Sequence, residues 1–190
     1  MKNFLFAIVM IFYVLSCQSK DRKPGINTDS LAIKTVKEFY DWYINEAYPK
    51  STSFYQVPGY KKLDETTYIF DLEEYKRRIN TINYFSKGFK KKLITRLENC
   101  NQEMQKIEWE YEPEPMFNID ACNYLWGNQW VGGQGERISG FIIDETHTNG
   151  NEATVMVSIL TGDKVFVRSK ILLEMKEKEY KIEDIVLKWN

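Results

Sequence analysis

The sequence is poor in the residues that carry much of enzyme and metal chemistry. Its 190 residues include one histidine and three cysteines, with no Cys-x-x-Cys pair. The single histidine, His147, stands beside an Asn-Gly turn signal, and no second histidine is present for a metal cluster or a His-assisted nucleophile. The glycines of 132–135 follow no strand-to-helix pattern, so they do not form a phosphate-binding loop. We therefore predict no metal and no cofactor.

The chain also lacks a charge excess of either sign. Its formal net charge is −1, so no overall field would recruit nucleic acid or an anionic membrane. One local basic stripe exists on a predicted helix, and we interpret it as a solvated helix face; it consists of Lys87, Lys90, Lys91, Lys92 and Arg96. We predict no nucleic-acid partner. With 43% hydrophobic and 15% aromatic residues, the chain can bury the core of a single domain.

Long apolar runs are missing except at the N-terminus. Lys2 precedes an apolar run from Phe4 to Leu15, which is too short for a stable membrane span and typical of the apolar region of a signal peptide. The run ends at Val14-Leu15-Ser16-Cys17, which resembles the bacterial lipobox, although leucine before the serine is less usual. We predict a lipoprotein signal peptide over 1–16 and a lipid anchor at Cys17. An ordinary signal peptide or an anchor helix is the alternative.

The residues after Cys17 indicate a tether and a destination. Residues 17–28 are mostly polar and contain Pro24-Gly25, which is typical of a flexible tether. Gln18, in place of aspartate, favours the outer membrane by the usual sorting rule, and Ser19-Lys20-Asp21 loosely resembles the export tag of surface lipoproteins. The expected location is the cell envelope, on the outer membrane, at its periplasmic face or at the cell surface. The expected membrane contact is the lipid anchor.

From about Arg137 to Trp189 the chain predicts a meander of four strands. Asn149-Gly150 between two alternating runs is a strong hairpin signal. Alternation then predicts two core-facing sets, which are Ala153, Val155, Val157 and Ile159, followed by Val165, Val167, Ile171, Leu173 and Met175. In the last strand the apolar parity changes near Glu183-Asp184, so we predict a β-bulge that bends the sheet.

Helices are predicted before the meander. The first begins in the N-cap cluster 27–30 and ends at Pro49, with an apolar stripe of Ala32, Val36, Phe39, Tyr40, Tyr43 and Ala47. Residues 50–67 show no period and predict an irregular excursion. A second helix, capped near Asp71, carries Leu72, Tyr75 and Ile79, and a third carries Phe85, Phe89, Leu93 and Leu97. The expected fold class is α+β, with N-terminal helices packed on a curved four-stranded antiparallel sheet that forms a cone.

Two cysteines remain beyond Cys17, namely Cys100 and Cys122. In an oxidising compartment they are a disulfide candidate that would close a loop of roughly 20 residues and stabilise the fold by about 3 kcal/mol. Two buried thiols are the alternative.

The stretch 109–134 combines two prolines with three tryptophans and lacks any period. Binding residues concentrate in such loops when a rigid scaffold holds them. We predict a ligand-binding mouth of Trp109, Asp120, Tyr124, Trp126 and Trp130. In the alternative interpretation, the aromatics simply plug the open end of the cone. Asp120 is also the one carboxylate whose surroundings could suit a general base.

Four segments carry a resemblance to a known family. They are 36–43, the Ser-x-x-Phe-x-x-x-Leu helix at 86–93, the Asp-aromatic loop at 119–130 and the closing Tyr180-Lys181-Ile182-Glu183-Asp184-Ile185. Together they resemble the nuclear transport factor 2-like superfamily, the cystatin-like cone, and more closely its bacterial lipoproteins of unknown function. The resemblance implies one domain over 29–190 with a cavity. It implies no reaction, because the motif around Asp120 does not match that of the superfamily's enzymes.

These observations favour a lipid-anchored envelope protein that is not an enzyme. It would bind a small molecule, a glycan or a peptide in an aromatic-lined cone. A protein-interaction module, such as an immunity or envelope-assembly protein, is the alternative, and an exposed apolar patch would favour it. A third hypothesis, a cavity enzyme that uses Asp120, requires that carboxylate to be buried.

Overall fold

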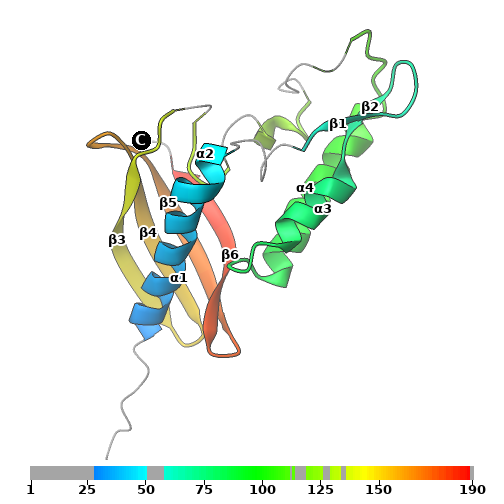
Figure 1. Ribbon diagram of the computed structural model, residues 1–190. Helices are drawn as coiled ribbons and strands as arrows, with labels where there is room; N and C mark the ends of the chain where they lie inside the picture. Colours follow the sequence, from blue (N-terminus) through cyan, green and yellow to red (C-terminus); the bar gives the residue numbers. More distant parts are fainter. Residues whose placement is uncertain are drawn as a thin grey trace, which may run out of the picture.

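The computed structural model confirms the α+β class (Figure 1). It describes residues 28–50, 58–111, 113, 119–125, 129–133 and 136–188. The predicted signal peptide, Cys17 and most of the tether lie outside these residues, as does Trp126. None of the described helices combines the length and the apolar character needed to cross a bilayer.

The first helix runs through the position where we expected it to end. Helix α1 (Thr28–Trp42) continues as a π-helical turn, η1 (Tyr43–Ala47), and then as α2 (Tyr48–Lys50). The prediction that Pro49 ends the helix is wrong. Proline has no N–H and collides with the carbonyl four residues earlier in an α-helix, and a π turn just before it changes that register. The Tyr48 N–H accordingly donates to the Tyr43 carbonyl, five residues back.

Part of the predicted irregular excursion is a small hairpin. Strands β1 (Tyr60–Lys62) and β2 (Tyr68–Phe70) pair antiparallel. Three-residue strands are too short to show alternation, which is why the sequence pattern missed them. The chain then enters α3 (Leu72–Asn80) through Asp71, whose carboxylate accepts from the Glu74 N–H at 3.0 Å, as the predicted cap requires.

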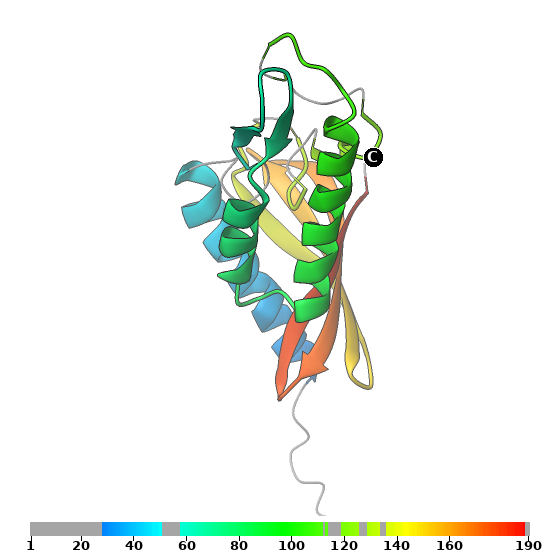
Figure 2. The same cartoon turned by 90° about the vertical axis from the view of Figure 1, so that its right-hand side faces the viewer.

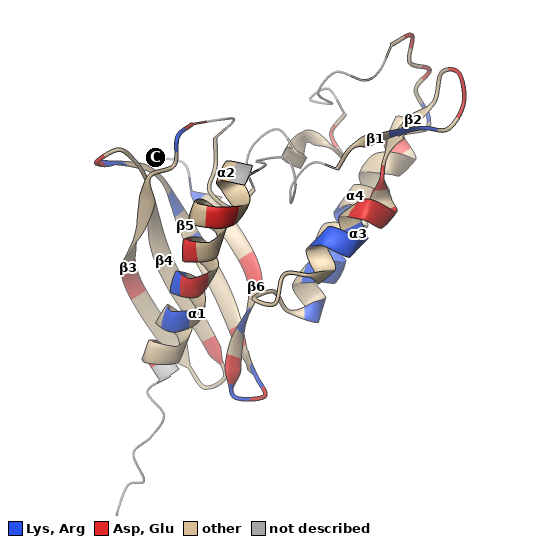
Figure 3. Cartoon of the chain, viewed as in Figure 1, with Lys and Arg blue, Asp and Glu red and all other residues tan. Residues whose placement is uncertain are grey.

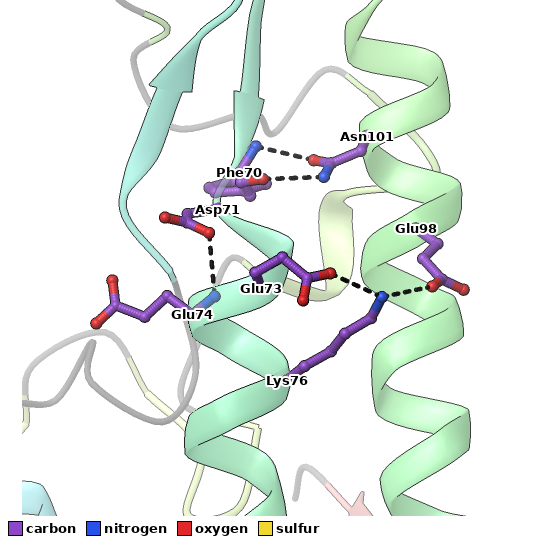
Figure 4. A network of polar contacts seen from close by, with 7 residues as sticks. All are labelled: Phe70, Asp71, Glu73, Glu74, Lys76, Glu98 and Asn101. Atoms are coloured by element: carbon purple, nitrogen blue, oxygen red, sulfur yellow. Dashed lines mark hydrogen bonds and ion pairs between the residues drawn. The ribbon is translucent and has the colours of Figure 1, made fainter.

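Helix α4 (Lys87–Met104) lies beside α3, and polar contacts join the two helices and the hairpin (Figure 4). The Asn101 side chain makes two hydrogen bonds to the backbone of Phe70, accepting from its N–H at 2.9 Å and donating to its carbonyl at 3.0 Å. The Lys76 ammonium lies 3.1 Å from Glu73 and 3.5 Å from Glu98, so it bridges the two helices. These bonds fix β2, α3 and α4 as one unit.

The sheet is an open meander of four antiparallel strands, as predicted. It consists of β3 (Gly140–Asn149), β4 (Glu152–Thr161), β5 (Lys164–Lys176) and β6 (Glu179–Lys188). The first hairpin forms at the predicted place, but Asn149 pairs with Glu152, so Gly150 and Asn151 occupy the turn. Of these two, only Gly150 has a positive φ, at 61°. Only one turn position therefore requires a positive φ, and Gly150 supplies it; the Asn-Gly pair does not form the two central residues of the turn.

Bulges decide which side chains reach the core. The predicted bulge is confirmed, because Leu172 pairs with Asp184 and Leu173 with Ile182, which leaves Glu183 as the extra residue. Another bulge places Phe166 between Val165 and Val167. This bulge turns the Val165 side chain away from the core, and Val165 is 40% exposed, whereas Val167 is fully buried. The prediction that Val165 faces the core is therefore wrong.

Two helical parts of the chain pack against the sheet. Helix α1 lies across β3, β4 and β6, and the α3–α4 hairpin joins the β6 side (Figures 1 and 2). The α3–α4 pair is attached to β6 by a parallel bridge between Phe85 and Ile182 and by an ion pair of 2.6 Å between Lys92 and Asp184. All four predicted core residues of β4 are buried.

Candidate functional site

Trp130 belongs to the core and does not line an open mouth. Its side chain is 1% exposed, and its ring makes edge contacts with Tyr43 at 5.0 Å and Phe85 at 5.1 Å. Its carbonyl accepts a hydrogen bond from the Tyr40 hydroxyl at 3.1 Å. This placement agrees with the alternative that aromatics fill the cone, and it corrects the expected position of Trp130.

Trp109 is half-buried and has a local role. Its indole N–H donates to the Met104 carbonyl at 3.3 Å, and its backbone N–H donates to the Thr66 carbonyl at 2.8 Å. The first bond gives the Met104 carbonyl a second donor beside the Ile107 N–H, and the second ties the end of α4 to the β1–β2 loop. Trp109 thus joins two elements, and binding by its ring stays a prediction.

Asp120 and Tyr124 lie on a segment that runs along α4. Cys100 on α4 and Cys122 are joined by a disulfide with a Cα–Cα distance of 4.9 Å. Tyr124, two residues after Cys122, stacks on Arg96, one helical turn before Cys100. Asp120, two residues before Cys122, borders the same hollow as Glu103, one turn after Cys100. The segment Ile119–Leu125 therefore runs antiparallel to α4, with the disulfide at its centre.

Asp120 is exposed, at the rim of a shallow hollow of about 420 Å³. The hollow lies between the last turn of α4 and the turn before the disulfide, and is lined by Glu103, Lys106, Ile107, Ile119, Asp120 and Ala121. Lys106 is paired with Glu103 at 2.6 Å. An exposed carboxylate lacks the desolvation that would make it a general base at neutral pH, so this geometry does not favour the cavity-enzyme hypothesis.

Arg96 lies over the ring of Tyr124, with its guanidinium carbon 4.0 Å from the ring centre. The sequence pattern placed Arg96 on a solvated helix face; the structure corrects this, because Arg96 is half-buried. No carboxylate pairs with Arg96, and no acceptor hydrogen-bonds to it, within the residues that the structure describes. The guanidinium therefore has a cation–π contact with Tyr124 and no ion pair among the described residues.

Two tyrosine hydroxyls accompany this guanidinium. Tyr75, on α3, is 1% exposed, and neither its hydroxyl nor that of Tyr124 has a hydrogen-bond partner in the described part of the chain. Burial raises the pKa of Tyr75 well above its ordinary value, Tyr124 raises it further, and the charge of Arg96 opposes both effects. Burial likewise raises the pKa of Tyr124 against the charge of Arg96. Both hydroxyls thus stay protonated at neutral pH and can donate.

We call Tyr75, Arg96 and Tyr124 the Arg96 cluster. It draws one residue each from α3, α4 and the 3₁₀ turn η2 (Asn123–Leu125). Tyr124 was predicted as a binding residue, whereas the roles of Tyr75 and Arg96 were missed. The sequence offered one signal for Tyr75: it lies on the apolar stripe of a helix, where its hydroxyl needs a hydrogen-bond partner.

A second hollow, of about 200 Å³, lies between α1, the α3–α4 turn and the β5–β6 hairpin. Its lysines are largely neutralised locally: Lys34 lies 3.8 Å from Glu38, and Lys181 lies 3.0 Å from Glu179. The N-terminal half of α4 carries the most basic run, visible in Figure 3, but Lys92 within it is paired with Asp184. The Arg96 cluster combines a cation without an ion pair with two unpartnered hydroxyls among the described residues.

Comparison with known proteins adds no relative. No family model, curated protein or solved structure matches the chain. Within the described residues, no group of three or more histidine, cysteine, aspartate or glutamate side chains could hold a metal ion.

Proposed function

We propose that the protein is a non-enzymatic binding protein of the cell envelope, anchored to the outer membrane through a lipid on Cys17. We also propose that its domain is nuclear transport factor 2-like, a proposal supported by the order of helices first and a bent meander last. Its ligand is a small molecule, a glycan or a peptide, and it binds along α4 and the segment Ile119–Leu125, outside the cone.

One observation carries the binding proposal. The segment Ile119–Leu125 is cross-linked to α4 at Cys100–Cys122, and the binding-capable groups stand on either side of the cross-link. A disulfide that fixes two elements reduces the ordering cost of a site built between them. The core, in contrast, is filled by aromatic rings around Trp130 and offers that residue no open surface.

A thermal-shift screen of the full chain in detergent, with glycans, peptides and small molecules, tests the binding proposal. A ligand should raise the melting temperature of the parent and not that of the Tyr124→Ala variant, because binding to the native state stabilises it by mass action. Tyr111→Ala is the matched control, because Tyr111 is a tyrosine at the surface with 75% exposure. If a ligand stabilises the parent and the Tyr124→Ala variant equally, its binding site does not include Tyr124. Incorporation of labelled palmitate that Cys17→Ser abolishes tests the anchor.

A second candidate function is protein interaction through the other face of the sheet. Strand pairing places Ile142, Met156, Leu172 and Val186 on that face in diagonal succession. Ile142 is 51% exposed and Val186 is 41% exposed. Apolar side chains in a row on an open sheet face are a common form of contact surface. If no small ligand stabilises the chain, a partner whose capture is lost in Ile142→Asp and retained in Tyr124→Ala would favour this function.

A further inference from the structure

We propose that the outer face of the sheet binds an acidic segment of a protein partner through Arg168, Lys170 and Lys188, which we call the basic corner. The outer face is the side that turns away from α1 and carries Ile142 and Val186. The inference deepens the second candidate function and rests on it, because it names the chemistry of the partner for that face.

The register of the strands brings the three cations together. Arg168 on β5 stands directly opposite Lys188 on β6, and Lys170 follows two residues after Arg168, so all three lie on one face of the sheet. The neighbours of Arg168 along the strand, Val167 and Ser169, are fully buried, so the face that carries Arg168 is the outer one. Arg168 and Lys188 are exposed and Lys170 is half-buried. A partner can therefore reach these charges.

The pairing of Arg168 with Lys188 is unfavourable in the chain by itself. Like charges directly opposite each other destabilise an antiparallel sheet. Neither of these two residues nor Lys170 has a carboxylate within ion-pair distance in the part of the chain that the structure describes. Carboxylates of a partner would turn this repulsion into attraction, which is the charge complementarity that interfaces commonly show.

The carboxylates of β3 do not supply that compensation. The Asp144 carboxylate accepts from the Ser158 hydroxyl at 2.7 Å, and Glu145 lies 2.7 Å from His147. Strand β4 separates β3 from β5, which carries two of the three cations. The acidic groups of this face are therefore engaged away from the basic corner.

Apolar side chains on the same face complete the surface. In register, Lys170 lies between Met156 on β4 and Val186 on β6. Val186 is 41% exposed, and Ile142 on β3 is 51% exposed. Arginine and methionine are enriched in protein interfaces, where apolar contacts lie among charged groups. A partner segment that carries both carboxylates and apolar side chains fits this face.

The position of the basic corner favours a protein partner over the membrane. Helix α1 begins beside the β3–β4 turn, where the Thr148 hydroxyl donates to the Asp29 carboxylate at 2.6 Å. Lys188 ends β6 at the opposite end of the sheet (Figure 1). Because the proposed lipid anchor precedes α1, the bilayer would lie nearer the end where α1 begins. The basic corner is at the other end.

The test measures peptide binding to the full chain in a neutral detergent, by fluorescence anisotropy of a labelled peptide. The probes are a peptide of alternating glutamate and alanine, the same peptide with glutamine in place of glutamate, and a short-chain phosphatidylglycerol as an anionic lipid competitor. We expect the acidic peptide to bind roughly tenfold more tightly than the glutamine peptide. Its affinity should fall as salt is added, because salt screens exposed charges.

Charge-reversal variants separate binding from folding. Arg168→Glu should weaken binding of the acidic peptide about tenfold or more. The melting temperature should stay equal or rise, because the variant places opposite charges across from each other at Lys188. Lys91→Glu is the matched control, since it makes the same change in net charge at an exposed position on α4. It should leave binding of the acidic peptide nearly unchanged.

Several results would overturn the inference. They are no binding of the acidic peptide, equal binding of the acidic and the glutamine peptides, and full affinity in Arg168→Glu. Displacement of the acidic peptide by phosphatidylglycerol would also overturn it, because it would assign the basic corner to a lipid surface. A protein partner that Ile142→Asp loses and Arg168→Glu retains would remove the acidic chemistry and leave the second candidate function standing.

Discussion

Two buried tyrosines show how differently the two halves of the molecule are built. Tyr40, on α1, is fully buried, and its hydroxyl bonds the Trp130 carbonyl at 3.1 Å and the Ser169 hydroxyl at 3.2 Å. Tyr75, on α3, is buried just as deeply, and its hydroxyl bonds nothing among the described residues. The Tyr40 hydroxyl completes its hydrogen bonds within the chain, whereas the Tyr75 hydroxyl is buried without a partner among the described residues.

The difference teaches which half is scaffold and which half carries the candidate site. The rings around Trp130 leave it no open surface, so the sheet and α1 supply rigidity. The Arg96 cluster is held by a cross-link and by helix packing and not by its own hydrogen bonds. Sites commonly keep such unsatisfied groups, and their stability comes from elsewhere in the fold. Four changes test this division.

The largest expected effect is in the scaffold half. Trp130→Ala removes the ring that contacts Tyr43 and Phe85, and should lower the free energy of unfolding by about 3–5 kcal/mol. Denaturation with urea, followed by circular dichroism, measures it. A loss below about 1 kcal/mol would mean that Trp130 lies at the surface after all.

Reduction of the disulfide comes next and acts on the site half. The cross-link spans 22 residues, so its loss should cost about 3 kcal/mol in the chain-entropy model. The urea midpoint of the parent should fall on addition of reductant, while a Cys100→Ala, Cys122→Ala double variant should start low and not respond. If the urea midpoint of the parent does not change on addition of reductant, the two thiols are not joined.

The two tyrosines should respond to the same substitution with opposite signs. Tyr40→Phe leaves buried polar partners at Trp130 and Ser169 unsatisfied and should destabilise by about 1–2 kcal/mol. Tyr75→Phe removes an unpaired hydroxyl and should be neutral or stabilise by up to about 1 kcal/mol. Urea titrations of both variants and of the parent measure these changes in the free energy of unfolding. Equal losses in the two variants would show that the Tyr75 hydroxyl has a partner and that the two halves do not differ.

The smallest effect concerns the cap that starts α3. Asp71→Ala removes the acceptor for the Glu74 N–H and should cost about 1 kcal/mol. Asp71→Asn keeps a capping oxygen and should recover most of that loss, which a pair of thermal melts can show. An unchanged melting temperature in Asp71→Ala would mean that water replaces the cap at no cost.

Local signals predicted much of this fold. The hairpin at Gly150, the cap at Asp71 and the bulge at Glu183 each depend on a few neighbouring residues, and each is confirmed. Local patterns failed at two places. At Pro49 a π turn lets the helix include a proline, and at Val165 one extra residue in the strand moves the side chain to the opposite face of the sheet. A single bulge changes every later parity, so alternation cannot be extended across it.

The candidate site was predicted less well because it is not local. The aromatic loop drew attention to Tyr124, but Trp130 from the same loop is a core residue. Helix α3, which carries Tyr75, packs on α4, which carries Arg96, and the disulfide at Cys122 holds the segment that places Tyr124 against Arg96. Neither the periodicity of a helix nor the composition of a loop specifies contacts between elements so far apart in sequence.

Hydrogen exchange of the full chain, with and without the ligand that the thermal-shift screen identifies, tests the division between the two halves most directly. The bound ligand should slow exchange in α4 and in the segment Ile119–Leu125, and leave β3 to β6 unchanged, because the ligand adds stability where it orders the protein. Slowed exchange confined to the sheet, or none in the Arg96 cluster while the ligand is bound, would contradict the account.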